Sequence, residues 1–150
     1  MHRTISLCVI VKDEAGFLDQ CLASYRALAD EIIIVDTGSA DNSPAIAEKH
    51  GARVFHAPWE GDFSKARNES LSHATQDWII WTDADDLVTE ENCAKIRQVR
   101  DTFGLDTCFS FLIKNSQDGI LGSIFNQVRM FPRHARIRFR NRVHEQVRAA

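Results

Sequence analysis

Closely spaced acids follow one of the short apolar runs in the sequence, in a pattern suited to binding a divalent metal. Asp83, Asp85 and Asp86 come directly after the run 78–81. Carboxylates this close repel one another unless a cation or hydrogen-bond donors compensate them. Oxygen ligands select Mg²⁺ or Mn²⁺, which bind through one or two carboxylates and fill their other positions with water and substrate phosphates. The acidic segment therefore predicts metal-assisted chemistry on a diphosphate.

Two other apolar runs also end in acid. Asp13 and Glu14 follow the run 5–11, and Asp36 follows the run 32–35. In open parallel sheets, ligands bind beyond the carboxyl ends of the strands, so these side chains are expected to share one crevice. A metal there would neutralise charge that builds on a departing phosphate oxygen.

The elements that must position these acids alternate between strands and helices. Such alternation is typical of βαβ units and predicts an α/β fold with a largely parallel sheet. The first helix has its apolar residues at i, i+3, i+4 and i+7, namely Leu18, Cys21, Leu22 and Tyr25. The expected strands are 5–11, 32–35, 53–57, 78–81, 107–113 and 124–131.

Three further helices are predicted from their end signals. Ser43 is expected to cap a helix that has Pro44 at its first position and ends at His50, with Gly51 just beyond. A second one begins at Asp62 or Ser64 and ends near residue 74. The last opens at Thr89 and buries an apolar face made of Ile96, Val99 and Phe103.

Composition limits the classes of protein. A chain of 150 residues with 44% hydrophobic residues predicts one domain over residues 1–150. A net charge of -3 argues against nucleic acid as a partner. No run approaches the roughly 20 apolar residues of a transmembrane helix. The four cysteines lack metal-ligand spacing and indicate buried thiols of a cytoplasmic protein, with attachment to a membrane surface left open.

Four segments, in this order, resemble the family 2 glycosyltransferases of the GT-A fold: ISLCVIVKDE, EIIIVDTGSADNS, FSKARNESL and DWIIWTDADD. They cover roughly the first two-thirds of the chain, and the last is similar to the family's DxD motif. The resemblance implies a Rossmann-like sheet flanked by helices. It also implies transfer of one sugar from a nucleoside-diphosphate sugar, with a UDP-sugar favoured and the acceptor unknown, by an inverting reaction that uses Mn²⁺ or Mg²⁺.

The same resemblance implies roles for individual residues. Asp85 would contact the metal, whereas Asp83 would face the ribose or donor sugar and border the metal. Asp36 would bind the nucleotide base, and Asp86 would either support the metal ligands or begin the next turn. The rest of the nucleotide pocket would consist of Lys12, Asp13, Glu14, Arg67 and Asn68.

The C-terminal stretch RMFPRHARIRFRNRVHEQV is similar to the end of the catalytic domain in a branch of this family that carries a VHE triplet. On that analogy His144 completes the metal or diphosphate site, and Glu145 is the base that deprotonates the acceptor hydroxyl. The ED pair that usually supplies the base in this family is absent. The assignment of Glu145 and the question of whether the domain is cut short at its C-terminal end therefore stay open. The QxxRW motif of processive synthases is also absent, which favours transfer of a single sugar.

Each candidate residue also has a structural interpretation. Asp36 could end a strand and start the turn 37–39, and Asp85 could belong to a solvated loop. Arg67 and Asn68 could be surface or packing residues of a helix, and the VHE residues could lie on the surface. A solvated face or an interface is favoured for most of the arginines at 129, 133, 136, 138, 140, 142 and 148.

Two other functions compete with glycosyl transfer. A nucleotidyltransferase that makes sugar nucleotides also uses an aspartate at a sheet edge and a divalent metal. Such an enzyme is expected to carry a glycine-rich, basic phosphate loop, and the segment VKDEAGF is not one. A non-catalytic module that only binds a nucleotide is the third hypothesis.

Overall fold

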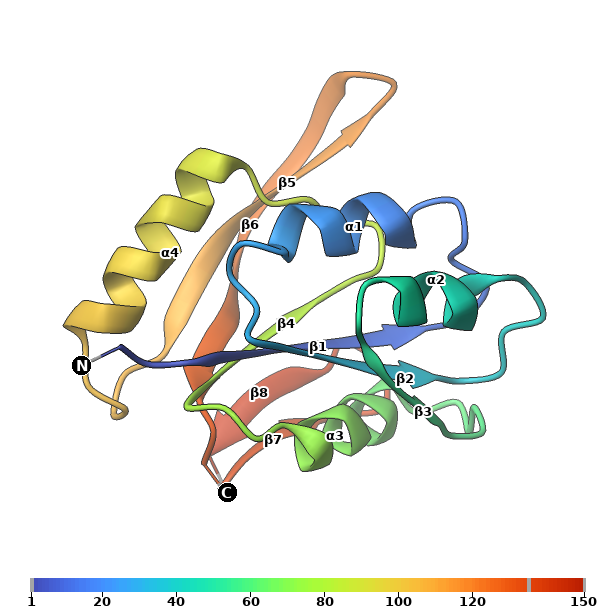
Figure 1. Cartoon of the computed structure of the whole chain (residues 1–150), viewed down its shortest axis with the longest axis horizontal. Coiled ribbons are helices and arrows are strands. Elements are labelled where there is room, and N and C mark those ends of the chain that lie inside the picture. Colours follow the sequence, from blue (N-terminus) through green and yellow to red (C-terminus); the bar gives the residue numbers. More distant parts are fainter. Residues whose placement is uncertain (1, 135, 150) are drawn as a thin grey trace.

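A mixed sheet with helices on both faces forms the centre of the computed structural model, which describes residues 2–134 and 136–149 (Figure 1). The strands are β1 (Ile5–Val11), β2 (Glu31–Asp36), β3 (Arg53–His56), β4 (Trp78–Thr82), β5 (Phe109–Gln117), β6 (Ile120–Pro132), β7 (Ile137–Arg140) and β8 (Gln146–Ala149). The helices are α1 (Leu18–Tyr25), α2 (Ser43–Lys49), α3 (Phe63–His73) and α4 (Glu90–Thr102).

Strand order brings the three acidic strand ends to one edge of the sheet. Within the described ranges the main sheet has six strands in the order β3-β2-β1-β4-β6-β5, and β7 and β8 form a separate pair. β1 lies between β2 and β4 and runs parallel to both, with Val11 opposite Asp36 and Val9 opposite Thr82. The loops that follow β1, β2 and β4 therefore leave the sheet side by side.

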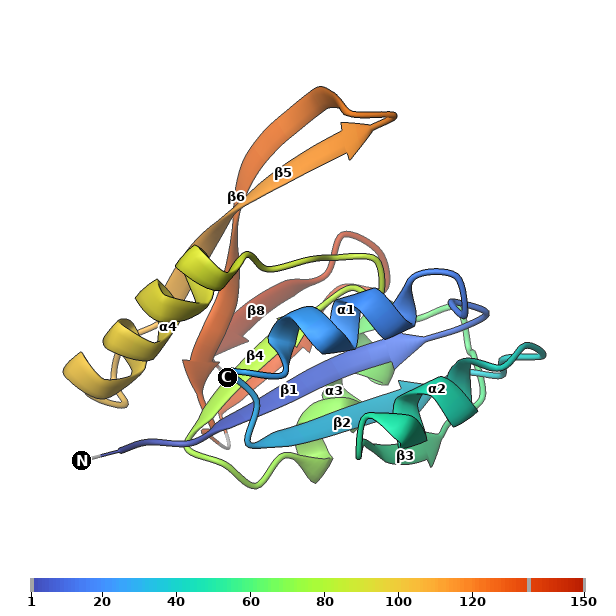
Figure 2. The ribbon, with the colours of Figure 1, turned by 45° about the horizontal axis from the view of Figure 1, so that its top comes forward.

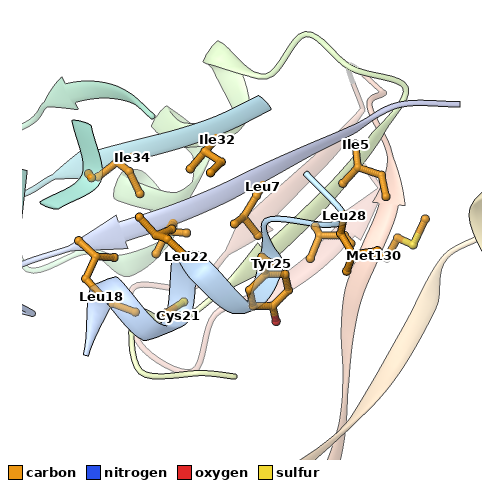
Figure 3. Close-up of a cluster of buried hydrophobic side chains, with 14 of the residues drawn as sticks. Ile5, Leu7, Leu18, Cys21, Leu22, Tyr25, Leu28, Ile32, Ile34 and Met130 are labelled. Carbon is orange, nitrogen blue, oxygen red and sulfur yellow. The ribbon is translucent and has the colours of Figure 1, made fainter. Parts of the chain in front are cut away.

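The two faces of the sheet have different covers. Residues Leu7 and Val9 of β1 point into a buried cluster with α1, α2 and α4, part of which is shown in Figure 3. Cys8, between them, points to the opposite face, where Leu71 of α3 and Phe139 of β7 pack. Figure 2 shows α1 and α2 on the near side of the sheet, with α3 and the β7–β8 pair behind it. Alternation along β1 thus builds both layers.

Most predicted boundaries are confirmed. The first four strands agree within about a residue at each end, and the four apolar residues of α1 are all buried. Asp62 and Thr89 cap α3 and α4, where their side chains accept hydrogen bonds from the backbone nitrogens of Lys65 and Asn92. The α/β fold with a mostly parallel sheet is therefore confirmed.

Three local predictions are wrong. Ser43 is the first residue of α2 and not its cap, because its hydroxyl donates to Asp41 and accepts from the backbone nitrogen of Glu14. Phe103 lies beyond the end of α4 and is 44% exposed, so it does not form the inner face of that helix. Cys108 is exposed, whereas the other three cysteines are buried as predicted.

The last two strands of the main sheet form a longer hairpin than the sequence patterns indicate. β5 and β6 pair antiparallel and turn at Asp118 and Gly119, which both have positive φ angles. The outer part of the hairpin extends away from the sheet in Figures 1 and 2. β7 and β8 were not predicted, because only their alternate residues Ile137, Phe139 and Val147 are partly or fully buried.

Candidate functional site

The loops after β1 and β2 are tied together by their own acids. The carboxylate of Asp13 accepts hydrogen bonds from the backbone nitrogens of Ala40 and Asp41, at 2.7 and 3.2 Å. Asp41 in turn accepts from the backbone nitrogen of Ala15 at 2.9 Å. Asp13 holds a positive φ of 54°, a backbone conformation that is uncommon for residues other than glycine. The two loops predicted to line the nucleotide pocket thus form one unit.

Asp36 ends β2 with a carboxylate that organises the following turn. It is 3% exposed and accepts hydrogen bonds from the backbone nitrogens of Gly38 and Ser39, with His56 at 3.4 Å. Burial by itself raises the pKa of Asp36, but the hydrogen bonds outweigh burial and the pKa lies below its ordinary value. Asp36 therefore ends the strand and holds the following turn, as its structural interpretation states. Its role toward a nucleotide base stays a prediction.

Asp83, the first acid after β4, is held by two arginines. One carboxylate oxygen accepts from Arg67 at 2.6 Å, and the other accepts from Arg129 at 3.3 Å. Burial raises the pKa of Asp83, yet the two positive charges and their hydrogen bonds hold it below the ordinary value. Arg67 comes from α3 and Arg129 from β6, so three separate elements meet at this carboxylate.

Both arginines also pack on Trp81, which lies two residues before Asp83 in β4. The guanidinium carbons of Arg67 and Arg129 lie 4.2 and 4.0 Å from the centre of the Trp81 ring. The indole nitrogen donates to the backbone oxygen of Val128 at 2.8 Å, which fixes the ring. A cation over an aromatic face is attracted more strongly when both are removed from water, and both arginines are almost fully buried.

Arg129 also contacts a second acid of the acidic segment. It donates to Asp86 at 2.8 Å, and Asp86 also accepts from the backbone nitrogen of Asp83 and from Thr82. Asp86 therefore closes the turn after β4 and supports Arg129. The sequence analysis expected a divalent metal to compensate this group of acids. Among the described residues, Asp83 receives positive charge from Arg67 and Arg129, and Asp86 from Arg129. The metal stays a prediction.

The role of Arg129 was missed, because it was grouped with arginines for which a solvated face was favoured. It lies instead at 3% exposure between apolar neighbours in β6. A charged residue inside an apolar strand run is itself a signal, since a buried guanidinium needs carboxylate partners.

Asp85 differs from its neighbours by being exposed, and no hydrogen bond or ion pair of its carboxylate occurs among the described residues. Glu14, from the loop after β1, lies close enough to interact electrostatically with Asp85. The pKa of Glu14 is raised above its ordinary value, first by burial and then by the negative charges of Asp85, Asp41, Asp83 and Asp13. Acids from the three loops therefore converge on one negative region.

Glu145 reaches the same cluster from the loop between β7 and β8. One of its carboxylate oxygens accepts from Arg67 at 2.7 Å, and its side chain is 13% exposed. His144 is exposed and has a positive φ of 53°. The loop is held against α3, because the backbone nitrogen of Phe63 donates to Arg142 at 2.9 Å and Ser64 donates to Asn141.

Asn68 and Lys12 lie differently from Arg67. The amide of Asn68 donates to the backbone oxygen of Phe139 at 3.0 Å and accepts from its backbone nitrogen at 2.8 Å. Both polar atoms of Asn68 are therefore engaged with β7, which supports the packing interpretation of this residue. Lys12 is exposed directly after β1.

The chemistry of the site suits a metal held by few protein ligands. No group of three or more metal-ligating side chains occurs in the part of the chain that the structure describes. Asp83 is already balanced by arginines, whereas Asp85 is exposed beside the other acids, whose charges add to the effect of burial in raising the pKa of Glu14. A single carboxylate fits Mg²⁺ or Mn²⁺ that takes its other ligands from water and phosphates.

A cavity of about 1030 Å³ opens beside the acidic turn. Asp85, Asp86 and Arg129 lie at one part of its wall, and the remainder comes mainly from α4 and β5. This cavity gives the site an open approach from the side of the hairpin.

Comparison with known proteins places the chain in a family. Residues 6–142 match the family model described as glycosyl transferase family 2. The chain belongs to glycosyl transferase family 2. The match confirms the resemblance of the motifs in this family 2 domain. The nucleotidyltransferase alternative is therefore set aside.

Curated relatives of the family 2 domain are much longer than the chain. A TPR repeat-containing protein of Synechococcus elongatus is 41% identical over 143 residues, which are 95% of this chain and 35% of that protein. The SPbeta prophage-derived glycosyltransferase SunS of Bacillus subtilis is 32% identical over 149 residues, which are 95% of this chain and 34% of SunS. The chain therefore spans about a third of these relatives.

Solved structures support the GT-A type fold. TarS of S. aureus has a TM-score of 0.55 and 23% identity, with 65% of this chain and 32% of that chain covered. Glucosyl-3-phosphoglycerate synthase of Mycobacterium tuberculosis, solved with UDP, has a TM-score of 0.50 and 27% identity. That match covers 57% of this chain and 35% of the synthase. Among the described residues, no helix is long and apolar enough to cross a membrane.

Proposed function

We propose that this family 2 domain transfers a single sugar from a nucleoside-diphosphate sugar, with a UDP-sugar favoured, to an acceptor hydroxyl, with inversion at the sugar carbon. The observation that carries the proposal is the bridge made by Arg67. Its guanidinium donates to Asp83 of the DxD segment and to Glu145 of the VHE triplet. A candidate base is thereby held next to the acid that is expected to face the donor.

The donor pocket would lie over the ends of β1, β2 and β4. Asp36 would accept a hydrogen bond from the base, and the loop of Lys12, Asp13 and Glu14 would border it. The mycobacterial synthase, which is 27% identical, was solved with UDP, and this supports a uridine nucleotide. Arg67 and Asn68 would support the pocket from α3, with Asn68 acting through β7.

Asp85 would be the main protein ligand of a Mn²⁺ or Mg²⁺ ion, with His144 as the predicted second ligand. Such an ion, when bound, neutralises charge on the diphosphate leaving group. Asp83 was predicted to border the metal as well. Because both of its oxygens are bound by arginines, we propose instead that it accepts a hydrogen bond from a hydroxyl of the donor.

Glu145 would act as the general base. In an inverting transfer the acceptor oxygen attacks the sugar carbon from the side opposite the leaving group. The proton of the acceptor hydroxyl passes to the carboxylate of Glu145, while the bond from carbon to the phosphate oxygen breaks and the nucleoside diphosphate leaves with the electron pair. Arg67 orients the base, as a third group does in many acid–base pairs.

Thermal-shift measurements with UDP and GDP, with and without Mn²⁺, test this function. We expect UDP to raise the melting temperature only with Mn²⁺, and Asp85→Ala to abolish that rise. Glu48→Ala, an exposed acid of α2, is the matched control and is expected to behave like the wild type. Equal shifts in wild type and Asp85→Ala would refute the site. Metal-dependent binding without transfer or hydrolysis of any donor would favour a non-catalytic module.

A further inference from the structure

We infer that Arg129 is a positioning residue of the candidate site, which together with Arg67 holds Asp83 as a hydrogen-bond acceptor and keeps it from serving as a metal ligand. The inference rests on the proposed function for its biological meaning. It deepens that function by separating the work of the two DxD acids. Asp85 is left to bind metal, and Asp83 is left to bind the donor.

The contacts of Arg129 leave it little freedom. Its guanidinium donates to Asp83 at 3.3 Å, to Asp86 at 2.8 Å and to the side chain of Gln127 at 3.0 Å. It also lies 4.0 Å from the centre of the Trp81 ring. A planar group with several fixed donors can satisfy these partners together, which a lysine ammonium cannot do.

Charge within the cluster is nearly balanced without a metal. Two buried cations, Arg67 and Arg129, face three carboxylates, which belong to Asp83, Asp86 and Glu145. Asp83 thus has a cation on each of its oxygens, and a divalent metal placed there would meet both guanidinium groups. A carboxylate has about four acceptor positions, so Asp83 retains capacity for a donor hydroxyl.

Removal of Arg129 would change this balance in a direction that a purely structural role does not predict. Without its positive charge, Asp86 loses its cationic partner and Asp83 keeps only Arg67, so the negative charge beside Asp85 increases by one unit. A more negative group of carboxylates attracts a divalent cation more strongly. The inference therefore predicts tighter metal binding together with weaker function, whereas loss of a residue that only supports folding would weaken both.

Titration of Mn²⁺ alone, followed by the electron paramagnetic resonance signal of the free ion, tests this on the full chain. Arg129→Gln is expected to bind Mn²⁺ about tenfold more tightly than wild type, and the added change Asp83→Asn is expected to remove most of that gain. Arg138→Gln, an exposed arginine of β7, is the matched control and is expected to match wild type. Unchanged or weaker Mn²⁺ binding by folded Arg129→Gln would overturn the inference.

A second variant keeps the test decisive if Arg129→Gln does not fold. Asp83→Asn, which preserves shape, is expected to leave Mn²⁺ affinity within about twofold of wild type, whereas Asp85→Asn is expected to lower it about tenfold. Equal losses in these two variants would overturn the inference. Failure of UDP to stabilise wild-type protein would refute the proposed function alone, since the titrations with Mn²⁺ contain no nucleotide.

Discussion

Arg67 donates from its Nε atom to Glu145 at 2.7 Å, across 78 residues of sequence. The side chains of this pair are 6% and 13% exposed, so the ion pair is largely removed from water. A buried charge that loses its partner costs several kcal/mol, which makes the pair a firm constraint on the loop between β7 and β8. The candidate base is therefore placed by α3, an element far from it in the sequence.

Replacement of Glu145 by glutamine tests the role of this residue as a base separately from nucleotide binding. Glu145→Gln retains an oxygen that can accept from Arg67 but cannot take a proton from the acceptor. Loss of general-base catalysis is expected to lower kcat by about 100-fold or more, with little change in UDP binding. Glu69→Gln, on the exposed side of α3, is the control. Full activity in Glu145→Gln would exclude it as the base.

Asn68 is expected to stabilise the fold without contacting nucleotide. Asn68→Ala removes both hydrogen bonds to Phe139 and should lower the free energy of unfolding by about 1–3 kcal/mol, because the backbone groups of β7 lose their partners. Urea denaturation measures the loss, and UDP titration is expected to give an unchanged affinity. Ser72→Ala, on the same helix, is the control for altered helix propensity. A large loss of UDP affinity at unchanged stability would restore the predicted nucleotide role.

The parallel half of the fold could be predicted because its signals are local. Apolar runs such as Ile32 to Val35 are buried on both faces, and caps such as Asp62 and Thr89 act within three residues. The outer hairpin and the β7–β8 pair consist of mostly exposed or mixed residues, which give little apolar pattern to detect. The strands expected at 107–113 and 124–131 form part of this hairpin, and its Asp118-Gly119 turn is a further local signal, since an Asp-Gly pair is a recognised hairpin turn.

The candidate site was predicted less completely than the fold. The end of each parallel strand identified Asp36, Asp83 and Asp85, because position along a strand determines which edge a residue reaches. The sequence does not indicate in the same way which group each of these acids binds. Whether Asp83 meets a metal or an arginine depends on where β6 carries Arg129, and β6 enters the sheet antiparallel beside β4.

The pKa of Glu14 predicts a dependence of stability on pH. Burial and nearby acids raise this pKa above the ordinary value of 4.5. The folded state therefore binds the proton more tightly than the unfolded state, and ionised Glu14 opposes folding above the folded-state pKa but has no effect below about pH 4.5. Glu14→Gln is expected to raise the melting temperature at pH 7 and to leave it unchanged at pH 4.

Two controls specify the cause of this effect. Glu48→Gln removes an exposed acid of α2 and is expected to shift the melting temperature little at either pH. Mn²⁺ should reduce the advantage of Glu14→Gln at pH 7, since a cation at Asp85 offsets the negative charge that Glu14 experiences. An equal effect of Glu14→Gln at both pH values would contradict this explanation.

The cysteines are expected to differ sharply in reactivity. Burial raises the pKa of Cys8 and of Cys21 to about 12, and Cys93 is buried as well, whereas Cys108 is exposed before β5. Because the thiolate is the reactive form, Ellman's reagent at pH 8 should label one thiol rapidly in the native protein and all four after denaturation. Cys108→Ser is expected to remove the rapid phase, and Cys93→Ser to preserve it. Rapid labelling of a second thiol would contradict this expectation and would show that a helix packed over a buried cysteine opens from the sheet, α3 for Cys8 and α1 or α4 for Cys21 and Cys93.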